Sequence, residues 1–403
     1  SMYIERHLEN VVNKMSLAFP IILVTGPRQV GKTTLLRKIS AENRAYVTLD
    51  NPLIRELAKT DPELFLQRYQ APVLIDEIQY APELLPHIKM RVDEKKQKGA
   101  FWLTGSQMFH MMKNVSESLA GRVGVIHMLG LSTSEIFDTG NQPYTTAYEQ
   151  LSGRKGSVKN VNDVFERIFK GSMPALYEIE QDIEQYYASY VNTYLQRDIR
   201  DLTQVADELS FMRFMQACAA RTGQMVNFSE LAKDVGITSP TAKQWLSILV
   251  SSGIITLLEP YFNNALKRIV KAPNMYFLDT GLCAYLTRWS SPQTLEVSAM
   301  AGPFFESYVV SEIIKSYYND GRRPPIYYYR DSDKKEIDLI IEQDGILHPV
   351  EIKKSGSPKK DAVRHFSVLE KKGLVLGQGN VICLCRELIP IDRKNHFVPV
   401  GLI

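Results

Sequence analysis

Short apolar runs alternate with helical patterns over the N-terminal part of the chain. The first run, Ile21–Val24, follows an amphipathic segment at residues 3–15 and precedes a helical pattern from Lys32 to Ser40. Buried strands that alternate with helices predict an α/β fold with a parallel sheet. Four later apolar runs fit further strands of this sheet: Ala45–Leu49, Pro72–Ile75, Phe101–Leu103 and Val123–Met128.

The loop after the first apolar run fits G-x-x-x-x-G-K-[ST], the pattern of phosphate-binding loops. Glycines at its two ends let the backbone wrap a phosphate closely, with successive N–H groups pointing at the anion. Lys32 would neutralise the β- and γ-phosphates, and the Thr33 hydroxyl would ligate Mg²⁺. The predicted ATP-binding loop consists of Gly26, Pro27, Arg28, Gln29, Val30, Gly31, Lys32, Thr33 and Thr34.

Two carboxylates follow the apolar run Pro72–Ile75, at the end of a predicted strand where open α/β sheets place their ligands. Asp76 suits the Mg²⁺ shell, and Glu77 suits a base that activates the water attacking the γ-phosphate. The alternative is that the pair only supplies negative charge to a helix N-terminus. A phosphate-binding loop one strand earlier favours the catalytic interpretation.

Two further residues near strand ends are candidates for the reaction. Ser106 follows the apolar run Phe101–Leu103 and would sense the γ-phosphate or orient the water, unless it is only a turn residue. Arg122 precedes the run Val123–Met128, where ATPases of this type often carry an arginine for the neighbouring subunit's nucleotide; a plain surface arginine is the alternative. This residue therefore predicts a homo-oligomer. No N-K-x-D stretch selects guanine, so ATP is the expected nucleotide.

The middle of the chain is predicted to hold a linker, a lid and a small DNA-binding unit. Residues 139–160 are polar and aperiodic, which is typical of a linker, and the helical segment 164–203 predicts a helical lid. Helical patterns at 209–221, 228–235 and 239–252, followed by strands at 254–258 and 274–277, predict a winged helix.

DNA is the candidate partner of this winged helix. Ser239 before Pro240 predicts an N-cap for the helix that would enter a groove. The predicted DNA contacts come from this helix and from the segment between the two strands: Ser239, Thr241, Lys243, Lys267 and Arg268. The alternative is that the unit packs against protein.

A cluster of charged residues is predicted in the C-terminal part of the chain. Glu306 lies early on a helix, and Asp338 and Glu351 lie in two apolar strands. Lys353 shares the face of Glu351 because side chains alternate along a strand. Two carboxylates with Glu306 can hold Mg²⁺ for phosphodiester cleavage, with the lysine positioning a water. A degenerate, non-cleaving version of the same cluster is the competing interpretation.

Size and composition limit the class of protein. A chain of 403 residues is too long for one ordinary core. The formal net charge of +3 neither requires nor excludes nucleic acid, so a DNA surface must be a local patch. The four cysteines form no C-x-x-C pair, which favours reduced, buried thiols. No apolar run is long enough for a membrane span, so the predicted location is cytoplasmic, with no membrane partner.

With these residues considered together, the chain resembles the bacterial and archaeal AAA-type ATPases that carry the AAA_14 and DUF4143 domains. The resemblance covers nearly the whole chain and is most specific at Gly26–Thr34 and Leu74–Gln79. Its softer marks are Leu103–Gln107, Ser118–Val123, Gly171–Pro174, Tyr194–Ile199, Tyr276–Leu282 and the set Glu306, Arg330, Asp338, Glu351 and Lys353.

The resemblance implies a P-loop core with strand order 5-1-4-3-2 and a catalytic glutamate, then a lid, a winged helix and an α/β restriction-endonuclease-like domain similar to the PD-(D/E)xK nucleases. Ile337 stands where those nucleases carry proline, which leaves cleavage open. The expected domains are an ATPase core at residues 1–138, a linker and lid at 139–205, a winged helix at 206–290 and a nuclease-like domain at 291–403.

Three hypotheses for function follow. The first is a Mg²⁺-dependent ATPase that binds DNA and couples hydrolysis to the nuclease-like domain. The second is an active nuclease regulated by ATP. The third is a nucleotide-controlled switch that binds a protein partner, which the near-neutral charge favours.

Overall fold

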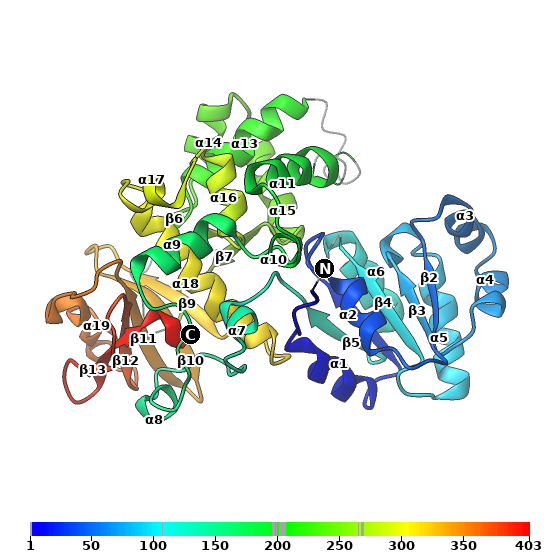
Figure 1. Ribbon diagram of the computed structural model, residues 1–403, viewed down its shortest axis with the longest axis horizontal. Helices are drawn as coiled ribbons and strands as arrows, with labels where there is room; N and C mark the ends of the chain where they lie inside the picture. The colour runs from blue at the N-terminus through cyan, green and yellow to red at the C-terminus, as the bar shows by residue number, and fades with distance from the viewer. Residues whose placement is uncertain are drawn as a thin grey trace.

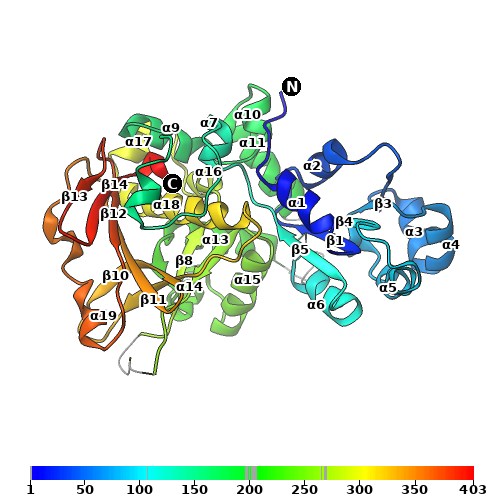
Figure 2. The ribbon, with the colours of Figure 1, turned by 90° about the horizontal axis from the view of Figure 1, so that it is seen from below.

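The computed structural model describes residues 2–106, 108–195, 198, 200, 207–264, 266 and 270–403. A sheet formed by the N-terminal residues and a second sheet formed by the C-terminal residues lie at opposite ends of the molecule, with helices between them (Figures 1 and 2). Among the described residues, no helix combines the length and the apolar character that a bilayer crossing requires.

The N-terminal sheet has five parallel strands in the order β2-β3-β4-β1-β5. This confirms the strand order that the sequence resemblance implied. Every residue of β1, β3 and β4 is buried, because helices cover both faces of the sheet. The strands are β1 (Ile21–Thr25), β2 (Ala45–Thr48), β3 (Val73–Asp76), β4 (Phe101–Gly105) and β5 (Val123–His127).

Two hydrophobic cores fill the two faces of this sheet. Ile21 and Leu23 belong to one core, whereas Ile22 and Val24 belong to the other, as the alternation of side chains along a strand requires. The predicted helix at residues 3–15 starts later, at Leu8, and the residues before it border the nucleotide cavity described below. The helices are α1 (Leu8–Ser16), α2 (Lys32–Ile39), α3 (Pro52–Thr60), α4 (Pro62–Arg68), α5 (Leu84–Lys95) and α6 (Met108–Leu119).

The predicted linker at residues 139–160 is mostly loop, but it is packed against the C-terminal part of the chain. Tyr144 is fully buried, and its hydroxyl donates to the Asn380 side chain at 2.7 Å. Its backbone N–H donates to the Ser316 hydroxyl at 3.0 Å. Polarity and missing periodicity predicted the loop correctly, but they do not report these contacts with distant residues. This stretch contains α8 (Tyr148–Leu151) and follows α7 (Thr133–Phe137).

The predicted lid divides into two parts with different neighbours. Helix α9 (Val161–Lys170) packs against helices of the C-terminal half. Helix α10 (Ala175–Glu178) borders the nucleotide cavity instead. Next come α11 (Ile183–Ser189) and a π-helical turn, Tyr190–Leu195. The predicted domain boundary between residues 205 and 206 lies outside the described residues.

Three helices and a three-stranded sheet follow. The helices are α13 (Glu208–Ala220), α14 (Phe228–Val235) and α15 (Ser239–Ser251), and the sheet order is β6-β8-β7. The prediction of Ser239 as the N-cap of α15 is wrong by one residue: the Thr238 hydroxyl accepts the Thr241 N–H at 3.3 Å. The strands are β6 (Gln224–Met225), β7 (Ile255–Leu258) and β8 (Asn274–Phe277).

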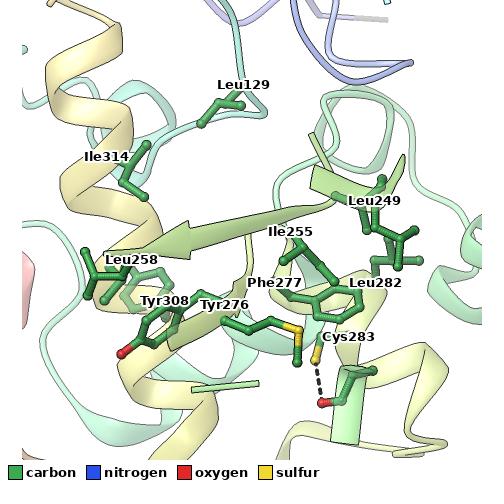
Figure 3. Packing of buried hydrophobic residues seen from close by; sticks show 14 of the residues in the cluster. Leu129, Leu249, Ile255, Leu258, Tyr276, Phe277, Leu282, Cys283, Tyr308 and Ile314 are labelled. Carbon is green, nitrogen blue, oxygen red and sulfur yellow. Dashed lines mark hydrogen bonds between the residues drawn. The ribbon is translucent and has the colours of Figure 1, made fainter. Parts of the chain in front are cut away.

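This unit shares its core with the C-terminal helix α18. Figure 3 shows Ile255 and Phe277 packed beside Leu249 and Leu282, with Tyr308 and Ile314 of α18 in the same cluster. The Cys283 thiol donates to the Ala219 carbonyl in this core, and all four cysteines are buried and free. The helices of this region are α16 (Thr280–Leu286), α17 (Pro292–Glu296) and α18 (Ala301–Tyr318).

The C-terminal sheet has six strands in the order β13-β14-β12-β11-β10-β9. Strand β12 is parallel to both neighbours, and the other pairs are antiparallel. Residues 360–371, a stretch rich in Lys and apolar residues, do not form one continuous helix, because a 3₁₀ turn (Lys360–Val363) and the short α19 (Ser367–Lys371) occupy it. The strands are β9 (Ile326–Arg330), β10 (Glu336–Gln343), β11 (Ile346–Ile352), β12 (Gly379–Cys383), β13 (Ile389–Pro390) and β14 (Asn395–Pro399).

Candidate nucleotide site

The loop Gly26–Thr34 connects the end of β1 to the start of α2. A Cβ at Gly26 would lie 1.9 Å from the Met128 carbonyl oxygen, so only glycine fits where the loop leaves the strand. Gly31 caps α2 with φ +97°, a conformation that favours glycine. Both glycines of the motif are therefore required by this backbone path, which directs the N-terminus of α2 toward the cavity.

The Lys32 side chain is buried under this loop. Its Nζ donates to the carbonyl oxygens of Gly26 (3.0 Å) and Pro27 (2.6 Å). Among the described residues, no carboxylate lies within 4.0 Å of this ammonium group. Burial lowers the pKa of Lys32 to about 8, and the charge of Glu77 offsets burial only in part. A buried cation without a direct anionic partner suits a phosphate group.

Asp76, at the end of β3, accepts hydrogen bonds from three threonine hydroxyl groups. Its Oδ1 accepts from Thr33, and from Thr104 at 2.6 Å, while its Oδ2 accepts from Thr48 at 3.0 Å. This arrangement connects the first turn of α2 with three strand ends. A carboxylate beside a threonine hydroxyl is a set of hard oxygen donors that suits Mg²⁺. Thr33 and Asp76 are therefore the residues that would hold the ion.

Glu77 has a left-handed backbone conformation, with φ +62°, stabilised by a hydrogen bond from its N–H to the Thr104 hydroxyl at 3.0 Å. Its carboxylate accepts from the Gln79 amide at 2.5 Å. The same amide nitrogen lies 3.4 Å from the Ser106 hydroxyl. Burial raises the pKa of Glu77, the direction that suits a general base. The structure thus places Ser106 beside Glu77, through Gln79.

Gln79 and Arg6 are site residues that the sequence patterns did not identify. Arg6 is buried; it donates to the Val30 carbonyl of the loop at 2.7 Å and pairs with Glu135 at 2.8 Å. Gln79 lies two positions after Glu77 and ends the stretch Leu74–Gln79 that carries the family resemblance, and these were the available signals. Arg6 has no comparable signal, because its partner Glu135 is 129 positions away.

These elements enclose a cavity of about 450 Å³. Its floor is the loop, with Lys32, Asp76 and Glu77. Tyr3 and Ile4 line it from the N-terminal segment, and Pro174, Ala175 and Glu178 line it from α10 and the residue before. The cavity therefore lies between the parallel sheet and the helical segment that the sequence predicted as a lid.

Arg122 is not part of this cavity. It directly precedes β5, and the register pairs Val123 with Ile21, so Arg122 lies near the opposite end of the strands from Gly26. Arg122 lies level with the residue before Ile21, which is six positions before Gly26; at the rise of a β-strand this is roughly 20 Å. The guanidinium pairs with Asp93 through two contacts of 2.7 and 3.0 Å. An action of Arg122 on the nucleotide of its own subunit is excluded, and an action on a neighbour stays a prediction.

The structure brings the predicted C-terminal carboxylates together. Asp338 and Glu351 lie on the adjacent strands β10 and β11, and the Asp338 N–H donates to Glu351 Oε1 at 3.1 Å. Tyr276 donates to Glu306 Oε1 at 2.6 Å. Burial, followed by the charge of Asp338, raises the pKa of Glu306 to about 8 and that of Glu351 to about 10. Glu306 and Glu351 therefore retain protons that free carboxylates would lose.

The expected Mg²⁺ geometry of this cluster is not present. Within the described part of the chain, no group of three or more His, Cys, Asp or Glu side chains is arranged to hold a metal ion. Lys353 Nζ lies 4.0 Å from Glu351 Oε2, and its side chain is 46% exposed. The lysine thus stands at the rim of the cluster, while the carboxylates form its buried part.

The predicted DNA contacts on α15 lie at its N-terminal half. Ser239 and Lys243 are exposed, and Thr241 is half-buried next to the N-cap. Lys267 and Arg268 lie outside the described residues. The described part of the predicted surface thus carries a single cation, Lys243.

Three family models match separate parts of the chain. An AAA domain matches residues 18–137, and two domains of unknown function, DUF8612 and DUF4143, match residues 161–293 and 301–403. The matched AAA domain contains the whole parallel sheet with its loop, Asp76 and Glu77. Together with that sheet, the match supports an AAA-type ATPase.

Two curated relatives have no stated activity. The chain is 28% identical over 343 residues to the uncharacterized proteins Mb2031c of Mycobacterium bovis and Rv2008c of Mycobacterium tuberculosis. In both cases the alignment covers 84% of this chain and 71% of the relative.

Similar solved structures include a DNA replication initiation factor, with 12% identity, a TM-score of 0.23 and coverage of 61% of this chain and 90% of that one. Protein VC1899 from Vibrio cholerae has 14% identity and a TM-score of 0.18, with coverage of 90% of this chain and 88% of that one. The STAND ATPase PH0952 from Pyrococcus horikoshii, which has a tetratricopeptide-repeat sensor, has 10% identity and a TM-score of 0.20. The coverage is 79% of this chain and 48% of that one. TM-scores this low do not establish a shared overall fold.

Proposed function

We propose that this chain hydrolyses ATP in a Mg²⁺-dependent reaction at the loop Gly26–Thr34, and that DNA binding and the C-terminal carboxylate cluster are coupled to it. The observation that carries the ATPase proposal is the buried ammonium of Lys32 beside the Asp76–Glu77 pair. These groups supply a phosphate-binding cation, a metal-binding carboxylate and a base within one cavity.

Each residue has a defined part in the reaction. Lys32 and the loop N–H groups bind the β- and γ-phosphates. Thr33 and Asp76 would hold Mg²⁺, which would supply neutralisation of the phosphate charge. Glu77 accepts a proton from the attacking water, whose oxygen forms a bond to the γ-phosphorus. The bond from that phosphorus to the bridging oxygen breaks, and ADP leaves with the electron pair. Gln79 orients Glu77 and links it to Ser106.

The Lys32→Ala variant tests the ATPase proposal. We expect it to lose ATP turnover, because the phosphate-binding cation is removed. Lys95→Ala is the control, since Lys95 is exposed in the last turn of α5 and does not line the cavity. Glu77→Gln should bind ATP but turn it over about 100-fold more slowly, because the base is lost while the metal ligands remain. Full turnover by Lys32→Ala would refute the proposal.

DNA contact through α15 is the part of the proposal that concerns a partner. The exposed Ser239 and Lys243 at the start of this helix support it. Titration of a fluorescent duplex at low salt should show binding, because phosphate contacts are strongest there. Lys243→Ala should weaken binding to all sequences alike and reduce the salt dependence. A flat titration would favour the alternative, a nucleotide-controlled switch with a protein partner.

A second candidate function is phosphodiester cleavage at the C-terminal cluster. The observation in its favour is that Asp338 and Glu351 lie on adjacent strands with a hydrogen bond between them, and that the charge of Asp338 reaches Glu306. A metal ion would have to rearrange these side chains, because no three of the described groups are arranged to hold one. Supercoiled, branched and single-stranded DNA should be incubated with Mg²⁺ or Mn²⁺. Cleavage by the wild type that is absent from Asp338→Ala would support a nuclease. Equal cleavage by both proteins would identify contamination.

A further inference from the structure

The side chain of Arg28, in the phosphate-binding loop, is held by the predicted lid. Its Nε donates to Asp198 Oδ2 at 2.5 Å, and Nη2 donates to the Tyr80 hydroxyl at 3.0 Å. The Tyr190 hydroxyl donates to the Arg28 carbonyl at 3.4 Å. Two residues that follow α11 therefore contact Arg28, one at its side chain and one at its backbone.

The remaining guanidinium nitrogen of Arg28 faces the reaction site. Among the described residues, Nη1 has no hydrogen-bond acceptor; it lies 4.0 Å from Glu77 Oε2, and Arg28 lines the cavity together with Lys32. Glu77 is the group that would handle the attacking water, so the terminal phosphate must lie close to it. Nη1 is therefore directed at the part of the cavity that a triphosphate fills and a diphosphate leaves free.

Asp198 is incompletely paired. Its side chain is only 7% exposed, and its Oδ1 has no hydrogen-bond partner within the described part of the chain. Arg28 is thus the main group that stabilises a buried carboxylate. Burial alone would lower the pKa of Arg28, but the hydrogen bond and charge of Asp198 outweigh burial and raise it. This pair is a strong one that only a comparable anion can replace.

We propose that Arg28 is the arginine that stabilises the charge of the terminal phosphate within the same subunit, and that Asp198 competes with this phosphate for it. When a nucleoside triphosphate binds, Arg28 exchanges Asp198 for phosphate oxygens. Asp198 then loses its counter-charge and must move toward water. The exchange transmits the presence of the third phosphate to Asp198. This inference rests on the proposed ATPase function.

A set of binding measurements tests the competition. Affinities for ADP and for a non-hydrolysable ATP analogue are measured with Mg²⁺ for the wild type, Arg28→Gln, Asp198→Asn and the double variant. Asp198→Asn should bind the analogue about tenfold more tightly, because the carboxylate that competes with phosphate for Arg28 is removed. Arg28→Gln should bind it about tenfold more weakly. The double variant should match Arg28→Gln, and ADP affinity should stay within about twofold throughout.

Turnover supplies a second readout. Arg28→Gln should lower kcat at least 100-fold, the order of magnitude reported for removing a positioned group that stabilises transition-state charge. Arg37→Gln is the control, because this arginine of α2 lies over the Tyr46 ring, away from Glu77. Equal changes in ADP and analogue affinity in Asp198→Asn, or wild-type kcat in Arg28→Gln, would overturn the inference.

The outcomes separate this inference from the proposed function. Wild-type protein that binds neither nucleotide overturns both. Wild-type protein that hydrolyses ATP, with a Lys32→Ala variant that does not, leaves the ATPase intact, and the ratio of analogue to ADP affinity then decides the role of Arg28 alone. Retained ADP binding by each variant shows that it is folded.

Discussion

Pro27 of the phosphate-binding loop lies directly against Gly253, the residue after the C-cap of α15. A Cβ at Gly253 would come within 2.6 Å of Pro27 Cγ and 2.9 Å of its Cδ. Gly253 has φ +75°, and its N–H donates to the Val250 carbonyl at 3.1 Å, so it ends the helix in the left-handed conformation. The nucleotide loop and the helix predicted to contact DNA are thus in van der Waals contact.

Gly253→Ala should weaken ATP binding about tenfold, because the new methyl group must displace Pro27 and with it the loop. The backbone strain of alanine at this φ costs about 1 kcal/mol in addition. Gly236→Ala isolates the contact: Gly236 ends α14 with φ +80° but has nothing within 4 Å of the added Cβ. Both variants should lose similar backbone stability, measured by urea unfolding, whereas only Gly253→Ala should change ATP affinity. Equal ATP affinities for the two variants would contradict this prediction.

ATP affinity should fall as the pH rises above about 8. Burial holds the pKa of Lys32 at about 8 in the nucleotide-free protein, and only the charged form attracts phosphate. Above this value the protein must take up a proton to bind, so affinity should fall up to tenfold per pH unit. Calorimetry in two buffers of different ionisation enthalpy measures the proton uptake. The pKa of Lys32 sets the pH range in which affinity should change. An ATP affinity that stays constant from about pH 7.5 to about 9.5 would therefore contradict the lowered pKa.

Glu306→Gln should reduce the pH dependence of stability. The folded-state pKa of Glu306, about 8, is above its usual value of 4.5, because burial favours the neutral acid. Glu306 therefore contributes its full stabilisation at pH values below 4.5. As the pH rises from there toward 8, the free energy of unfolding falls by about 1.4 kcal/mol per pH unit. Glutamine removes this titration and keeps an oxygen acceptor for Tyr276.

Thermal unfolding in EDTA between about pH 5 and 8 measures this effect, and that range spans the raised pKa. Glu149→Gln is the control, since this glutamate of α8 is exposed and lies outside the carboxylate cluster. If the Tm of Glu306→Gln falls with pH as steeply as that of the wild type, the buried carboxyl does not titrate as predicted.

Arg122→Ala should keep wild-type ATP turnover in dilute protein. Arg122 lies near the opposite end of the sheet from the loop, and Asp93 binds its guanidinium. The rate of phosphate release at several protein concentrations measures this. Lost turnover that returns when Arg122→Ala and Lys32→Ala are mixed would instead establish an arginine acting across a subunit interface.

Local patterns were sufficient for the elements and the core of the nucleotide site. The order of glycines, lysine and threonine in Gly26–Thr34 follows from the backbone path that a phosphate requires, so it can be read without the fold. Asp76 and Glu77 were predictable for a related reason, because parallel strands bring their carboxyl ends to one edge of the sheet. The end of a helix is less determined, since neighbouring residues such as Thr238 and Ser239 can both act as the cap.

Contacts between residues far apart in the chain could not be predicted in this way. The sequence determined that the chain has a phosphate-binding loop, a metal-binding aspartate and a candidate base, because each depends on neighbouring residues. Only the tertiary structure decided that Arg28, rather than Arg122, faces Glu77, that Asp198 holds this arginine, and that Gly253 touches the loop. These relationships depend on how the helices pack against the sheet, and packing joins residues from 49 to 226 positions apart, whose pairing leaves no periodic signal in the sequence.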